Sequence, residues 1–196
     1  RKTIIYSIMV CLLSSCAASY KKIEPNRIQY TKANEDQNIQ FAYRYDVLQA
    51  SGNKRYAKKE TKRGIQVVAV ELTNNSNEAI NISEQVKFYV EDSELFPLDP
   101  DVSFKALRQP VPLFLLYGLL FLNIDNNGDR TSIPIGLGIA AGNMAVAAGA
   151  NKSLKQELTD YRMMSDTLAS GETQRGLLVF RNTRFAPLRI ALNSEE

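Results

Sequence analysis

The sequence predicts a mainly β protein, an antiparallel β-sandwich that carries a helical hairpin as an insertion. Two observations predict the sandwich: short segments in which apolar and polar residues alternate, and clusters of turn-forming residues between them. A third predicts the insertion, because two apolar runs of helical length follow one another between residues 110 and 150. Residues 39–196 are expected to form one domain, with the helical insertion at about 102–161.

The alternation is clear on both sides of the insertion. Apolar side chains occupy every second position from Ile39 to Val47, which predicts a strand with one buried face. The segment from Ile65 to Leu72 is apolar on both faces, as expected of a central strand, and the turn formers TNNSNEA follow it. Further strands are expected at residues 80–90, 176–180 and 188–192.

The first apolar run predicts a helix from about Pro112 to Ile124. Its ten mostly apolar residues, 113–122, would span about 15 Å as a helix, half of the ~30 Å bilayer core, so a membrane span is not expected. The second run predicts a longer helix, from about Ile135 to Tyr161, whose glycines make it a weak membrane helix. Small residues recur at four-residue spacing in that helix and are expected to receive the first one: Gly138, Ala141, Gly142, Ala145 and Gly149.

The apolar side of this hairpin has two possible roles. It can pack against the sandwich of its own chain, or it can remain exposed and contact a partner subunit or the bilayer surface. The candidate residues for a partner or membrane contact belong to the first helix and are Leu113, Phe114, Leu116, Tyr117, Leu120 and Phe121.

Composition restricts the chemistry that this chain can perform. The 196 residues carry a net charge of +3, too small to indicate a nucleic-acid partner, and include no histidine. Ser-His and Cys-His nucleophile pairs are therefore excluded, and a zinc site is not expected. A Ser-Lys pair built from Ser165 with Lys152 or Lys155 lacks the SxxK pattern such nucleophiles use, and a neighbouring Asp166 does not replace it. We expect no catalytic residues and no cofactor.

Two charged segments have alternative interpretations. In DNNGD, the oxygen-bearing residues Asp125, Asn127 and Asp129 have the spacing of a calcium loop, but Arg130 stands where that loop has glycine. A plain turn, and no metal, is therefore expected. The second segment, residues 52–63, could contact an anionic surface or form a solvated loop; its six cations are Lys54, Arg55, Lys58, Lys59, Lys62 and Arg63.

The first residues have the three parts of a secretory signal: Arg1 and Lys2, an apolar stretch from Ile4 to Leu13, and small residues. The run Leu13-Ser14-Ser15-Cys16 resembles the bacterial lipobox, in which the cysteine is acylated and becomes the first residue of the mature protein. This resemblance implies a signal peptide at 1–15 and lipidation of Cys16; the alternative is an ordinary secretory signal that ends near a cysteine. Cys11 would be discarded with the signal, so no disulfide is expected.

Residues 16–38 are polar and lack an apolar period, which predicts a flexible tether after the lipidated cysteine. Ala17, directly after that cysteine, resembles the signal for sorting to the outer membrane. The expected location is therefore the cell envelope, with the lipid anchor in the outer membrane of a Gram-negative bacterium.

Three stretches carry a second resemblance. VVAVELTNNSNEAINI, FYVEDSELFPLDP and TLASGETQRGLLVF are similar to the immunoglobulin-like accessory domains of bacterial lipoproteins, a type often catalogued as a domain of unknown function. The resemblance covers about residues 65–100 and 166–192 and implies an Ig-like sandwich, while residues 102–161 stand where the family has a short connection. It implies no particular activity.

The sequence thus predicts a lipid-anchored cell-envelope protein that acts as a non-enzymatic binding or structural module. The alternative is a self-assembling or membrane-interacting lipoprotein that uses the apolar hairpin, and an enzyme without histidine chemistry is the third possibility. The expected partners are the membrane through the lipid anchor and an envelope protein or a second copy of the chain.

Overall fold

The computed structural model describes residues 16–35, 38–126, 129–163, 167–182 and 185–193. The predicted signal peptide, including Cys11, and the pair Ser165 and Asp166 lie outside the described residues. The chain divides into two compact units. The first comprises residues 1–20 and 109–153, of which 16–20, 109–126 and 129–153 are described, and we call it the apolar unit. The second comprises residues 21–108 and 154–196, and we call its described part the sheet unit.

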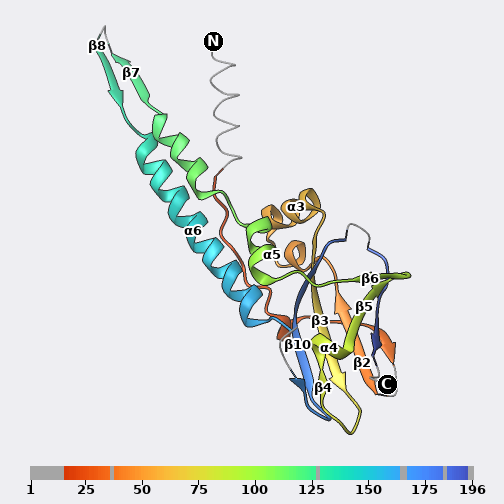
Figure 1. Ribbon diagram of the computed structural model, residues 1–196. Helices are drawn as coiled ribbons and strands as arrows, with labels where there is room; N and C mark the ends of the chain where they lie inside the picture. Colours follow the sequence, from red (N-terminus) through yellow and green to blue (C-terminus); the bar gives the residue numbers. More distant parts are fainter. Residues whose placement is uncertain (1–15, 36–37, 127–128, 164–166, 183–184, 194–196) are drawn as a thin grey trace. The chain divides into compact units, whose positions relative to one another are not determined.

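The sheet unit contains two main antiparallel sheets (Figure 1). The larger has the strand order β1-β2-β3-β10, and the smaller the order β11-β5-β6. Their strands are β1 (Thr31–Glu35), β2 (Ile39–Arg44), β3 (Gln66–Asn74), β5 (Val86–Val90), β6 (Ser93–Leu95), β10 (Thr173–Phe180) and β11 (Leu188–Leu192). The strands predicted at 39–47, 65–72, 176–180 and 188–192 are therefore confirmed in type, with boundaries shifted by a few residues.

The two sheets contribute to one hydrophobic core. β3 pairs with β2 and β10 at its two edges and is buried along most of its length. On one face, its Val68, Val70 and Leu72 pack in one core with side chains of the smaller sheet. From the smaller sheet, the Phe88 ring lies 6.1 Å from that of Phe41 and 5.5 Å from that of Phe180, both in the larger sheet. Edge-to-face and tilted contacts of this kind stabilise aromatic clusters beyond the area they bury. The described residues include both helices and strands, so the predicted antiparallel sheets are present within a mixed fold.

The strand predicted at residues 80–90 is interrupted. Only Ile80–Asn81 (β4) and β5 are extended, and a helical turn, α4 (Ile82–Gln85), separates them. Asn81 starts the turn because its side chain accepts a hydrogen bond from the Ser83 N–H at 3.1 Å. β4 leaves the main sheets and pairs with β9 (Thr167–Leu168).

The prediction of a flexible tether as far as Asn38 is wrong for most of that stretch. It contains a short 3-10 helix, η1 (Pro25–Arg27), and β1, which pairs with β2 at the edge of the larger sheet. An edge strand can be polar because it contributes backbone hydrogen bonds on one side only. The buried carboxylate of Glu157 also holds this segment, accepting hydrogen bonds from Ile23 N (2.8 Å) and Glu24 N (2.9 Å).

The basic segment predicted as a loop is helical. It forms α3 (Lys54–Arg63), which follows the short α2 (Val47–Ala50). Tyr56 and Glu60, four residues apart, form the buried face of α3, and Gly64 ends the helix with a φ of +62°. The charge-rich sequence therefore belongs to an amphipathic helix, in which the cations occupy the remaining faces.

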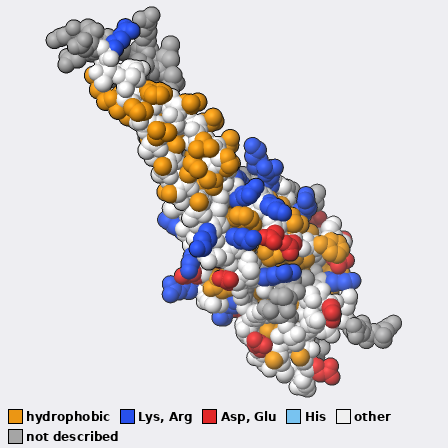
Figure 2. All heavy atoms as spheres, turned by 60° about the vertical axis from the view of Figure 1, so that its left-hand side comes forward, with side chains coloured by type: hydrophobic (Ala, Val, Ile, Leu, Met, Phe, Trp, Pro, Cys, Tyr) orange, Lys and Arg blue, Asp and Glu red, His pale blue; other side chains and the backbone are white. Residues whose placement is uncertain are grey.

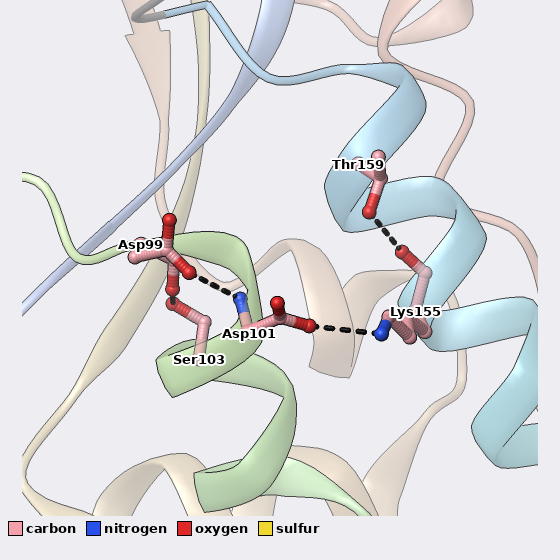
Figure 3. A network of polar contacts seen from close by, with 5 residues as sticks. All are labelled: Asp99, Asp101, Ser103, Lys155 and Thr159. Atoms are coloured by element: carbon pink, nitrogen blue, oxygen red, sulfur yellow. Dashed lines mark hydrogen bonds and ion pairs between the residues drawn. The ribbon is translucent and has the colours of Figure 1, made fainter.

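A further helix, α5 (Pro100–Leu107), lies in the sheet unit at the start of the predicted insertion. Asp99 caps it by accepting a hydrogen bond from Asp101 N at 2.7 Å (Figure 3). Lys155 is 2.9 Å from the Asp101 carboxylate, and this hydrogen-bonded ion pair holds the pKa of Asp101 below its usual range. Both side chains are largely exposed, so the pair orients α5 locally and adds little stability.

The insertion is only partly the predicted helical hairpin. The second helix is confirmed as α6 (Gly136–Asp160). The first is a 3-10 run, η2 (Val111–Leu119), and the prediction of a helix to Ile124 is wrong, since β7 (Leu122–Asn126) and β8 (Asp129–Ile133) form an antiparallel hairpin there. The chain becomes extended at Leu120, whose carbonyl accepts a hydrogen bond from Gly136 N at 2.9 Å.

Candidate functional site

The apolar unit contains η2, the β7–β8 hairpin, residues 136–153 of α6, and residues 16–20. η2 and α6 run in opposite directions. At one end, Gln109 and Asn151 exchange two hydrogen bonds: Asn151 Oδ1 accepts from Gln109 N at 2.7 Å, and Asn151 Nδ2 donates to Gln109 O at 2.9 Å. At the other end, Gly136 N donates to Leu120 O.

Between these ends a small core holds η2 to α6. The rings of Phe114 and Tyr117 stack at 6.2 Å and pack in one cluster with the buried Ala140 and Ala147. Gly136 allows the backbone of η2 to approach α6 closely, because a Cβ at this position would lie 2.0 Å from the Tyr117 carbonyl oxygen. The contact therefore depends on alanines and one glycine of α6.

The predicted small-residue stripe is not the contact. Added Cβ atoms at Gly138, Gly142 and Gly149 would meet no atom within 4 Å, and Ala141 and Ala145 are exposed. The predicted stripe was wrong because α6 has small residues on several faces. Four-residue spacing alone does not identify the face that η2 covers.

Much of the surface of the apolar unit consists of exposed large apolar side chains, which Figure 2 shows gathered together. No Asp, Glu, Lys or Arg occurs in residues 109–124 or 131–151. The exposed set comes from η2, the hairpin and α6: Leu113, Leu115, Leu116, Leu119, Phe121, Leu122, Ile124, Ile133, Ile135, Leu137, Ile139 and Val146. Exposed apolar patches of this kind are typical of surfaces that bind a protein or a membrane.

The six residues predicted for a partner or membrane contact divide into two groups. Leu113, Leu116 and Phe121 are exposed, whereas Phe114 and Tyr117 are buried in the unit's own core, with Leu120 packed against it. The sequence reasoning missed the apolar residues of β7 and β8. In β7, apolar and polar residues alternate from Leu122 to Ile124, but these residues end an apolar run that also fits a helix.

Cys16 lies on this unit and is exposed. The neighbouring Ala17 N donates a hydrogen bond of 2.5 Å to Asn143 Oδ1 on α6. Ala18 and the Gln109 side chain exchange two more: Ala18 N donates to Oε1 at 3.0 Å, and Nε2 donates to Ala18 O at 2.6 Å. The predicted lipidation site is therefore held beside the exposed apolar surface.

The six cations predicted for an anionic surface are spread around α3 in the sheet unit. Lys54, Lys58, Lys62 and Arg63 are exposed, and Arg55 and Lys59 are partly covered. Lys59 Nζ donates a hydrogen bond to the Arg108 carbonyl. Burial, together with the neighbouring Arg63, Arg108 and Lys62, lowers the pKa of Lys59. A helix with four exposed cations remains compatible with an anionic partner, but no observation identifies one.

A cavity of about 240 Å³ lies in the sheet unit beside α3. Glu60 and Gln66 line it and are largely buried. Glu60 Oε1 accepts a hydrogen bond of 2.5 Å from Val67 N, whereas neither polar atom of the Gln66 amide has a partner among the described residues. Burial raises the pKa of Glu60 to about 7; the Val67 hydrogen bond opposes this rise and the Asp46 carboxylate adds to it.

The calcium loop that was weighed as an alternative at DNNGD finds no support in the strand pairing. β7 and β8 place Asp125 opposite Arg130 and Asn126 opposite Asp129 as ladder partners, an arrangement unlike a calcium loop, and Asn127 lies outside the described residues. Within the described part of the chain, no group of acidic or cysteine side chains could hold a metal ion. The described helices include none with the length and apolar character of a membrane span. Comparisons with protein-family models, curated proteins and solved structures give no match to this chain.

Proposed function

We propose that this chain is a lipid-anchored protein of the cell envelope, attached to the outer membrane of a Gram-negative bacterium, which acts as a non-enzymatic binding or structural module. One observation carries the proposal: the run Leu13-Ser14-Ser15-Cys16 follows an apolar stretch that itself follows Arg1 and Lys2. The exposure of Cys16 supports it, because an acyl chain needs access to the bilayer. The lack of histidine favours a binding or structural role over catalysis.

We further propose that the sheet unit is an immunoglobulin-like sandwich. Two antiparallel sheets with a shared aromatic core support this assignment. Its departures from a plain sandwich are the helices α2 and α3 between β2 and β3, and the small β4–β9 pair. In this proposal the sheet unit offers the binding surface, and the second candidate role, contact through the apolar unit, is favoured by the exposed leucines described above.

Mass spectrometry of the protein purified from membranes of an expressing Gram-negative bacterium tests the lipid anchor. We expect a mature chain that begins at Cys16 and carries the mass of two or three acyl chains. Cys16→Ser should abolish that mass. Cys11→Ser is the matched control and should leave it unchanged, because Cys11 belongs to the predicted signal peptide. A mature chain that begins elsewhere, or an unmodified Cys16, would contradict the proposal.

A further inference from the structure

The β7–β8 hairpin has two unlike faces. In the register of the hairpin, Leu122 pairs with Ile133, and Ile124, two residues further along β7, pairs with Thr131. The intervening pair, Asn123 with Ser132, lies on the opposite face because side chains alternate along a strand. Away from the turn, the hairpin is therefore mainly apolar on the face of Leu122, Ile124 and Ile133 and polar on the other; at the turn end the first face continues with the polar pair Asn126 and Asp129. A two-sided element of this kind suits the boundary between water and hydrocarbon.

The hairpin does not suit the centre of a bilayer. Only two strands pair in this sheet, so each has an outer edge whose backbone groups need water or lipid headgroups. Charged residues also lie at the turn end of the hairpin, Asp125 in β7 and Asp129 and Arg130 in β8. These features favour the interfacial layer over the hydrocarbon core.

Cys16 lies on the same unit, and the adjacent Ala17 contacts Asn143 in the N-terminal third of α6. The contacts of the unit run from the Gln109–Asn151 pair at one end to the Leu120–Gly136 bond at the other. Asn143, which holds Ala17, lies between them, about 10 Å along the helix from Gly136 at 1.5 Å per residue. An acyl chain on Cys16 would therefore begin beside the uncharged part of the unit.

We propose that the apolar unit, from the level of Asn143 to the β7–β8 hairpin, lies in the interfacial layer of the bilayer beside the acyl chains of Cys16. This inference rests on the lipid anchor proposed above. Two observations favour lipid over a second copy of the chain. The predicted attachment point is on this surface, and the exposed apolar residues are spread over η2, the hairpin and α6, a surface that fluid lipid can cover without a matching partner face.

Fluorescence with a single introduced cysteine tests the proposal on the full acylated chain. Cys11 is removed with the signal and the Cys16 thiol is blocked by lipid, so Leu119→Cys provides a unique label site. Phe96→Cys in the sheet unit is the matched control, because Leu119 is 74% exposed and Phe96 is 71% exposed. Each variant carries an environment-sensitive dye and is reconstituted in vesicles of phosphatidylethanolamine and phosphatidylglycerol.

We expect the dye at residue 119 to shift to shorter wavelength and to be quenched by lipids that carry a quencher on the acyl chain. The dye at residue 96 should instead be quenched by iodide in the water. Iodide quenching at residue 119 equal to that at residue 96 would overturn the proposal. Shielding of residue 119 from both quenchers would also overturn it, since a second copy of the chain would then cover the surface.

A second measurement uses the unlipidated mature chain, which begins at residue 16 and carries Cys16→Ser, in a flotation assay with the same vesicles; this chain lacks the apolar stretch of the predicted signal peptide. The double change Leu116→Asp and Leu119→Asp should lower vesicle binding by roughly tenfold or more, because an acidic residue is strongly disfavoured in the membrane. Phe96→Asp with Phe185→Asp is the control: Leu116 and Phe185 are 65% and 62% exposed, and this pair should leave binding unchanged. Equal effects of the two pairs, or no binding by the starting chain, would overturn the proposal.

The two proposals fail in different ways. The acyl mass on Cys16 does not depend on the apolar unit, so its absence would remove the lipid anchor and the basis of the inference together. An acylated chain whose residue 119 is quenched by iodide would retain the anchor and remove only the interfacial contact.

Discussion

The stability of the sheet unit should fall as the pH rises through neutrality, because of Glu60. The side chain of this residue is only 8% exposed, and burial raises its pKa from 4.5 to about 7. The folded state therefore binds this proton more tightly than the unfolded state. Folding takes up a proton between these two pH values, and the free energy of unfolding decreases across that interval.

The size of the effect follows from the two pKa values. The stabilisation is complete below pH 4.5 and is lost as the pH rises through about 7. The difference between 4.5 and about 7 corresponds to about 3 kcal/mol, at about 1.4 kcal/mol for each pH unit. Replacing Glu60 with glutamine removes the titration and keeps a carbonyl oxygen that can accept the Val67 N–H hydrogen bond.

Urea unfolding followed by circular dichroism, at several pH values from 5 to 8, measures this difference. The natural chain should lose up to about 3 kcal/mol more than Glu60→Gln over the range. Glu78→Gln is the control, because Glu78 is exposed and this variant should follow the natural chain. Parallel curves for the natural chain and Glu60→Gln would refute the reasoning, since they would show that Glu60 titrates alike in the folded and unfolded states.

Further predictions concern packing and the N-terminal segment. In the apolar unit, Gly136→Ala should lower the thermal midpoint because its Cβ would collide with the backbone of η2, whereas Gly142→Ala should raise it slightly because its Cβ meets open space on a helix. Phe88→Ala should lower the free energy of unfolding in urea by about 3–5 kcal/mol, since it empties the aromatic cluster between the sheets; a loss under about 1 kcal/mol would contradict that packing. Glu157→Ala should speed hydrogen exchange at the amide of Ile23, measured by mass spectrometry, while unchanged exchange would show that the carboxylate does not hold the segment.

The main strands could be predicted from the sequence because their side-chain pattern is local. Alternation in β2 and β11 indicates a strand with one buried face, and the continuous apolar run of β3 indicates a strand with two buried faces. β1 could not be predicted in this way. Its residues, TKANE, have no apolar period, and they form a strand because the edge of β2 offers hydrogen-bond partners.

The candidate site, like the strands, could be predicted from the sequence only in part. Composition identified an uncharged apolar segment, and the lipobox resemblance predicted lipidation of Cys16. Neither indicated that the two lie on one unit, because the link is the hydrogen bond from Ala17 to Asn143, across more than a hundred residues of sequence. The helix predicted to Ile124 failed because leucine and phenylalanine fit a 3-10 helix, an α-helix or a strand, and the pairing of Leu122 with Ile133 decided among them.

By itself, the sequence determined which segments are apolar, which alternate, and that histidine is absent, because these properties depend on residue type and local spacing. The tertiary structure decided which faces of those segments are covered. Ala140 and Ala147 are buried, while Gly138 and Gly142 on the same helix are not. The difference arises because Phe114 and Tyr117 pack against the face of α6 that carries the two alanines. Burial depends on contacts between residues that are distant in the sequence. Local patterns do not indicate which distant residue packs against a given face.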